Sequence, residues 1–300
     1  MKKQDSLKYL NPESVKSLGS FKLIARAIVE GFLVGLHKSP FHGFSAEFSE
    51  YRQYMKGDEP RHIDWKVFAR TDRYYIKQFE EETNLHASIV LDRSASMGYS
   101  SGPVSKWQYG TFLTGALCYL LYKQRDNFSV SLFSDKIDEI TPFRHSLNHL
   151  NYIFSLLQSL ETAGKTEMQN ALHLLAEKLR YRGLVIIISD FMGLDLENIK
   201  RALLHFRHGK HEVIVFHILD PMEITLDFEG EVQFVDLETG QKIKTHPSRL
   251  KEKLYRTMEA HLMDLHHFCQ NHQIDYNRIL TSDSFVKALT SFFAKRVGMK

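Results

Sequence analysis

Residues 184–191 read LVIIISDF, an unbroken apolar run that ends in Ser189 and Asp190. Apolar side chains at every position are typical of a parallel strand that is buried on both faces of its sheet. Helical patterns flank the run, at about residues 167–179 before it and 196–206 after it. The run therefore indicates an α/β fold rather than an all-helical or all-β one.

The alternation of strand and helix continues in both directions from this run. Parallel strands joined by helices require right-handed crossovers and give a doubly wound, mostly parallel sheet of the Rossmann type. Strands are expected at residues 86–92, 127–134, 211–219 and 274–280, and helices at residues 106–125, 146–160, 248–271 and 284–296. A short edge strand is expected within residues 135–143, and residues 223–246 predict an inserted β-hairpin around Glu238-Thr-Gly240.

The first 80 residues follow other patterns. Asn11 suits a helix cap with Pro12 at the first helical position, and one helix is expected from there to about Leu36. Residues 44–73 mix aromatic and charged residues without a clean period, and residues 74–79 indicate a strand. We therefore expect an N-terminal segment at residues 1–80 and one larger α/β domain at residues 81–300.

Composition narrows the class of protein. A chain of 300 residues with 43% hydrophobic and 25% charged residues has the composition of a globular protein rather than a disordered one. The net charge is only +3, and Glu252 dilutes the basic stretch at residues 242–256, so no nucleic-acid partner is expected. Cys118 and Cys269 form no disulfide framework, which favours a reducing compartment.

The N-terminus has no apolar stretch close behind its basic residues, so no export signal is expected. The most apolar long helix, residues 21–36, carries Lys22, Arg26 and Glu30 at four-residue steps. These charges line one helical face, which indicates an amphipathic helix rather than a transmembrane segment. The sequence thus predicts a cytoplasmic protein.

Polar side chains follow two of the expected strands, where ligands of doubly wound sheets bind. Asp92, Ser94 and Ser96 come after the strand at residues 86–92, and Asp190 ends the apolar run. Thr166 lies in a loop before a further helix. Two carboxylates and three hydroxyls suit a hard divalent cation such as Mg²⁺ or Mn²⁺. Taken alone, the Asp92–Ser96 fragment and Asp190 are about equally typical of a turn with a helix cap, and Thr166 alone favours a cap. That alternative stays open.

The order and spacing of these five residues resemble the metal-ion-dependent adhesion site of von Willebrand factor A domains. The pattern of that site is Asp-x-Ser-x-Ser, then a Thr in a Gly-x-Thr loop, then an Asp after an apolar strand. The resemblance implies that the hydroxyls of Ser94, Ser96 and Thr166 ligate the metal, and that Asp92 and Asp190 act largely through water or hydrogen bonds. It also implies an open coordination position for an acidic residue of a protein ligand.

The segment at residues 50–82 resembles the hallmark of the bacterial domain of unknown function 58 family, R-x-Y-x-x-G-D-x-x-R-x-I-D-W-x-x-x-A-R. The matching residues are Arg52, Tyr54, Gly57, Asp58, Arg61, Ile63, Asp64, Trp65, Ala69 and Arg70. The resemblance implies a MoxR-type AAA+ ATPase as partner. The alternating acids and arginines predict either a structural ion-pair network above a buried Trp65, which we favour, or a recognition surface for the ATPase.

Two classes of function remain. We favour a metal-dependent protein–protein interaction module without catalytic residues, an adaptor or co-factor of a MoxR-type ATPase in the assembly or remodelling of protein complexes. The alternative is a Mg²⁺-dependent phosphoryl hydrolase with Asp92 as nucleophile, although Ser94 stands where such enzymes place a second acidic residue. A zinc site at His261 and His272 is a weaker candidate than a solvated histidine-rich face.

Overall fold

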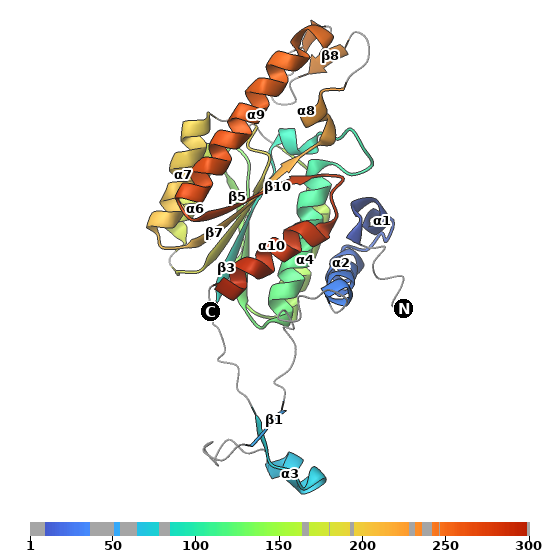
Figure 1. Cartoon of the computed structure of the whole chain (residues 1–300), viewed down its shortest axis with the longest axis vertical. Helices are drawn as coiled ribbons and strands as arrows, with labels where there is room; N and C mark the ends of the chain where they lie inside the picture. The colour runs from blue at the N-terminus through green and yellow to red at the C-terminus, as the bar shows by residue number, and fades with distance from the viewer. Residues whose placement is uncertain are drawn as a thin grey trace.

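The computed structural model describes residues 10–36, 51–54, 65–77, 85–163, 168–179, 181–192, 195–227, 232–235, 242–245 and 247–298. A six-stranded sheet lies at the centre, in the order β10-β7-β6-β3-β4-β5 (Figure 1). Its strands are β3 (His86–Asp92), β4 (Asn127–Phe133), β5 (Ile137–Ile140), β6 (Leu184–Ser189), β7 (Glu212–Leu219) and β10 (Ile274–Leu280). All neighbouring pairs are parallel except β5, which runs antiparallel to β4. The predicted doubly wound, mostly parallel sheet is confirmed.

Helices cover both faces of this sheet (Figure 1). One face carries α2 (Phe21–Leu36), α4 (Lys106–Lys123), α5 (Leu147–Ser159) and α10 (Phe285–Gly298). The other carries α6 (Met168–Lys178), α7 (Leu196–His208) and α9 (Pro247–Asn271). Every residue of β6 is buried, and alternate side chains of this strand enter the two opposite cores, as expected of a central parallel strand.

The N-terminal region that was predicted to form one helix forms two helices. Helix α1 (Pro12–Lys16) begins at Asn11, whose side chain accepts a hydrogen bond from the backbone N–H of Glu13 at 3.1 Å. The chain then breaks at Gly19, which has a φ of 67°, a left-handed conformation that glycine adopts at low cost. The single-helix prediction was therefore wrong at this point, because the glycine allows a turn between α1 and α2.

Helix α2 packs against the domain through one apolar face. Ile24, Ile28 and Phe32 are buried in the same core as α4, and the Phe32 ring stacks on Phe293 at 5.3 Å. A Cβ at Gly115 of α4 would lie 2.5 Å from a ring carbon of Phe21, so this glycine lets the two helices meet. The predicted amphipathic character of residues 21–36 is confirmed. The domain boundary after residue 80 stays a prediction.

Part of the hallmark segment forms a small unit of β1 (Tyr51–Gln53), α3 (Trp65–Thr71) and β2 (Tyr75–Lys77), with β1 and β2 antiparallel. Residues 55–64, which carry Asp58, Arg61 and Asp64, lie outside the described residues. Trp65 is 59% exposed, so the interpretation that placed it in a buried position was wrong. Its ring meets Phe68 edge-on at 6.1 Å, which covers only part of the indole.

The predicted insertion, residues 223–246, begins inside the short helix α8 (Pro221–Thr225). Strands β8 (Val232–Val235) and β9 (Lys242–Thr245) pair antiparallel, which confirms the hairpin. The first half of α9 extends beyond the sheet, with β8 lying beside it at the top of Figure 1. Among the described residues, no helix combines the length and the apolar character that crossing a membrane would require.

The two cysteines lie in separate cores. Cys118 of α4 and Cys269 of α9 are both buried and free, on opposite faces of the sheet. Burial raises the pKa of the Cys118 thiol, and it raises the pKa of the Cys269 thiol to about 12. Both thiols are therefore uncharged at neutral pH and inert in the folded protein.

Candidate metal centre

The predicted site residues meet where the strand order of the sheet reverses. β3 pairs with β4 on one side and β6 on the other, and the register Leu91 with Ile188 brings Asp92 and Asp190 to the same edge. Beyond β3 the chain turns through the 3-10 helix η3 (Ala95–Gly98). Such a reversal leaves a crevice at the carboxyl ends of the strands, where open α/β sheets bind their ligands.

Asp92 is completely buried and organises the loop that follows it. Its Oδ1 accepts a hydrogen bond from the backbone N–H of Ser94 at 2.8 Å, and its Oδ2 accepts one from the Ser189 hydroxyl at 2.6 Å. Burial raises the pKa of the Asp92 carboxyl to about 7, and the negative charge of Asp190 adds to this effect. An opposite charge next to Asp92 would favour its ionised form.

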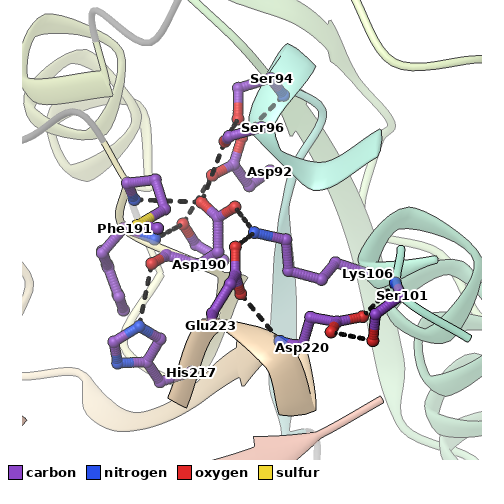
Figure 2. A network of polar contacts seen from close by, with 12 residues as sticks. Asp92, Ser94, Ser96, Ser101, Lys106, Asp190, Phe191, His217, Asp220 and Glu223 are labelled. Atoms are coloured by element: carbon purple, nitrogen blue, oxygen red, sulfur yellow. Dashed lines mark hydrogen bonds and ion pairs between the residues drawn. The ribbon is translucent and has the colours of Figure 1, made fainter. Parts of the chain in front are cut away.

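A row of oxygen atoms crosses from the β3 loop to the end of β6 (Figure 2). The hydroxyls of Ser94 and Ser96 lie 3.0 Å apart, and the Ser96 hydroxyl donates to Asp190 Oδ1 at 3.1 Å. Asp190 Oδ1 also accepts the backbone N–H of Met192 at 3.1 Å. Four of the five predicted residues are thus brought together.

The fifth predicted residue, Thr166, lies outside the described residues. The chain that leads toward it is held at the site, because the Ala163 N–H donates to the backbone carbonyl of Arg93 at 2.9 Å. The Arg93 side chain reinforces this contact by donating to the Glu161 carbonyl at 2.6 Å. Thr166 therefore stays a prediction.

The donor set fits a hard cation. In an octahedral Mg²⁺ site with bonds of about 2.1 Å, neighbouring ligand oxygens lie about 3 Å apart. The spacings of 3.0 Å and 3.1 Å along Ser94, Ser96 and Asp190 are of this size. Across the described residues there is no cluster of three or more His, Cys, Asp or Glu side chains that could hold a metal, so the histidine-rich face of α9 shows no zinc-type site.

Sequence reasoning missed a lysine at this site. The ammonium of Lys106, the first residue of α4, lies 2.6 Å from Asp190 Oδ2 and 2.5 Å from Glu223 Oε1 (Figure 2). Its side chain is 1% exposed. Burial lowers the pKa of Lys106, but the charges of Asp190 and Glu223 outweigh burial and the net pKa is raised, so the ammonium stays charged.

Glu223 is held in turn by the start of α8. Its Oε2 accepts the backbone N–H of Asp220 at 2.8 Å, and Asp220 Oδ1 accepts the N–H of Met222 at 2.9 Å, so the two form a capping box. Asp220 Oδ2 also accepts the backbone N–H of Ser101 at 2.8 Å. Asp220 follows the end of β7, so extending the strand-end rule to this third strand could have found the group.

Asp190 is fixed from behind by a neutral histidine. His217 Nε2 lies 2.9 Å from the Asp190 backbone oxygen, and its Nδ1 lies 2.7 Å from the Tyr276 hydroxyl. Burial lowers the pKa of His217 to about 4, so it is uncharged at neutral pH. Phe191 has a φ of 50°, an uncommon conformation for a bulky residue, and its ring lies edge-on to His217. The backbone at Asp190 is thus tightly determined.

Several solved structures are similar to this chain in part. The crystal structure of a conserved hypothetical protein BatB from Bacteroides thetaiotaomicron is 19% identical and covers 72% of this chain and 100% of its own, with a TM-score of 0.47. The VWA domain of SpRpn10 is 11% identical and covers 69% of this chain and 94% of its own, with a TM-score of 0.40.

Sequence relatives match the chain over different lengths. An uncharacterized protein of Mycobacterium tuberculosis is 25% identical over 261 residues, which are 85% of this chain and 81% of the relative. An uncharacterized protein of Bacillus anthracis is 29% identical over 160 residues, 52% of this chain and 56% of the relative. Residues 50–263, from the hallmark segment through the candidate site and into α9, match the family described as protein of unknown function DUF58. This match takes in the hallmark segment, the candidate site and more than half of the chain, so the chain belongs to the DUF58 family.

Proposed function

We propose that this chain is a metal-dependent protein–protein interaction module. A hard divalent cation, Mg²⁺ or Mn²⁺, is held by Asp92, Ser94, Ser96, Thr166 and Asp190 and completes its coordination with a carboxylate of a protein partner. The observation that carries this proposal is the row of Ser94, Ser96 and Asp190 oxygens, spaced at 3.0 Å and 3.1 Å across the ends of two adjacent strands.

The chain's own residues orient the site. Hydroxyls are weak ligands, so an ion held by serines keeps residual charge that attracts an acidic group of a partner. Both oxygens of Asp92 already accept hydrogen bonds, from Ser94 and Ser189. This favours the binding role over the phosphoryl hydrolase, because a nucleophilic Asp92 would need a free oxygen aimed at the substrate.

The cation is tested by thermal unfolding and calorimetric titration with Mg²⁺ and Mn²⁺. We expect the native chain to bind the cation. Ser96→Ala and Asp92→Asn should lose this binding, because the first removes a ligand oxygen and the second removes a carboxylate that orients the site. Asp227→Asn is the matched control, since that carboxylate is 77% exposed and contacts Lys251 of α9 instead. Equal stabilisation of all four proteins by the cation would place the ion elsewhere and end the metal part of the proposal.

The partner is proposed to be a MoxR-type AAA+ ATPase, with the chain acting as its adaptor in the assembly or remodelling of protein complexes. Support for this part comes from the hallmark resemblance, and the site adds only the expectation of an acidic ligand. Purified ATPase should bind the immobilised chain in Mg²⁺ and dissociate in a chelator, and Ser96→Ala should not bind it. Binding that survives the chelator would contradict the metal bridge, and absence of binding would contradict this partner.

A further inference from the structure

The lysine at the candidate metal centre occupies a position that is unfavourable for a positive charge. Lys106 is the first residue of α4, whose first turn contains no acidic residue. A cation at a helix N-terminus is unfavourable, because the helix dipole places partial positive charge there. Burial of an ammonium adds a further cost. A residue that breaks local rules at a site points to a role in that site.

The position of the ammonium is determined from three elements. Lys106 comes from the start of α4, Asp190 from the end of β6, and Glu223 from α8. Glu223 cannot easily follow the lysine elsewhere, because its second oxygen caps the start of α8 through the Asp220 N–H. The loop before α4 is tied to the same group by the Ser101 backbone contact to Asp220.

The two oxygens of Asp190 face different groups. Oδ1 faces the Ser96 hydroxyl, on the side where the proposed cation would lie, and Oδ2 faces the Lys106 ammonium at 2.6 Å. A divalent cation on the serine side would therefore share Asp190 with a charge that is already present. Repulsion between the two cations, in a site with little water, weakens binding of the second.

We propose that Lys106 is an internal cation that competes with the divalent ion for Asp190 and sets its affinity low. This inference rests on the proposed metal site and deepens it by naming the residue that controls how readily the site fills. With Asp190 and Glu223 both facing one ammonium, the group keeps a negative balance that still attracts Mg²⁺. Removing the ammonium makes the net charge of the group more negative, which strengthens its attraction for the divalent cation.

The test replaces Lys106 with methionine, which keeps the length of the side chain and removes its charge. Calorimetric titration of the full chain with Mg²⁺ and Mn²⁺ is expected to show at least tenfold tighter binding in Lys106→Met. Lys123→Met is the matched control, because Lys123 is an exposed residue in the last turn of the same helix. The affinity of this control variant for Mg²⁺ and Mn²⁺ should equal that of the native chain. A purely structural role for Lys106 would leave the affinity unchanged or weaken it, and either result in folded protein overturns the inference.

A second variant keeps the inference testable if Lys106→Met fails to fold. Glu223→Gln removes negative charge from the group while the ammonium remains, so Mg²⁺ binding should weaken several-fold, opposite in sign to Lys106→Met. Unchanged or tighter binding in Glu223→Gln also overturns the inference.

Failure of the proposed function is distinguishable from failure of this inference. The double variant Lys106→Met with Asp92→Asn should lose the gain in affinity, and a gain that persists places the ion elsewhere and overturns both. Binding in Lys106→Met but not in the native chain, lost again in the double variant, supports the inference and contradicts a filled native site. No Mg²⁺ or Mn²⁺ binding in any folded variant overturns both.

Discussion

At the scale of single residues, Gly183 lies close to the backbone of the neighbouring strand, just before β6 begins. A Cβ at this position would lie 1.9 Å from the backbone oxygen of His86, at the start of β3. Gly183→Ala must therefore push the starts of β3 and β6 apart, at the end of the sheet opposite the candidate site. We expect a loss of about 2 kcal/mol or more in the free energy of unfolding. Urea denaturation measures the effect.

Gly102→Ala is the control for this prediction, because a Cβ there has no atom within 4 Å. Its free energy of unfolding should change by less than about 0.5 kcal/mol. A Gly183→Ala protein as stable as this control would contradict the described approach of the two strands.

The site residues differ in how far the sequence predicts them. Asp92, Ser94 and Ser96 lie within one short turn, so their type and spacing predicted that they face one another. Asp190 was predicted from its place after an apolar strand. Lys106 was missed because its partners, Asp190 and Glu223, are 84 and 117 residues away in the sequence. No local pattern shows that the first residue of α4 lies next to them in the fold.

At the scale of elements, the crossing of α2 over α4 depends on Gly115. Gly115→Ala would favour the helix intrinsically by about 1 kcal/mol. The added Cβ would however lie 2.5 Å from the Phe21 ring, which also packs against Phe112 and Phe154. We expect the clash to win and the free energy of unfolding to fall by about 1–3 kcal/mol.

A double-mutant cycle with Phe21→Ala checks this prediction by thermal and urea unfolding. Phe21→Ala alone should cost about 3–5 kcal/mol, as for other buried aromatic side chains. In its presence Gly115→Ala should become neutral or stabilising, because the ring it strikes is gone. Simple additivity of the two changes would contradict the contact.

A second element-scale prediction concerns the ion pairs that join β7 to α10. Glu212, at the start of β7, lies 2.6 Å from the Lys295 ammonium and 3.3 Å from Arg207. Burial raises the pKa of the Glu212 carboxyl, but Lys295 and Arg207 outweigh this and the net pKa is lowered. The resulting stabilisation is present above the ordinary pKa of Glu and is lost as the pH falls through the lowered pKa in the folded state.

Glu212→Gln should therefore reduce the free energy of unfolding by about 0.5–1 kcal/mol at pH 7, since the pair is partly exposed. The difference from the native chain should shrink in acid, below the ordinary pKa of Glu. Glu197→Gln is the control, because Glu197 is 63% exposed beside Lys200 and should have a smaller effect. A difference that grows in acid would contradict the assignment.

At the scale of the whole molecule, α2 belongs to the core of the α/β domain. Ile24, Ile28 and Phe32 bury their side chains there, and each such side chain contributes about 1.5–3 kcal/mol. A chain without residues 1–36 should unfold at a lower temperature and bind a hydrophobic dye strongly through the uncovered face of α4 and α10. Unchanged melting and dye binding would contradict the described packing.

The fold was predictable where the pattern is periodic. The central strands carry continuous apolar runs, and β10 matches its predicted bounds, residues 274–280. The break at Gly19 was missed because a glycine inside a helical pattern is compatible with either outcome. The exposure of Trp65 was missed because residue type alone favours burial, whereas the small unit of β1, α3 and β2 covers only one edge of its ring.

The two buried thiols can report when each core of the protein becomes exposed during unfolding. Cys118 reports on one side of the sheet and Cys269 on the other, and neither meets solvent in the native state. Timed alkylation followed by peptide mass mapping would therefore measure the rate at which each of the two cysteines becomes exposed. Simultaneous modification would mean that the chain opens as one cooperative body, and earlier modification of Cys269 would mean that the layer of α6, α7 and α9 detaches first.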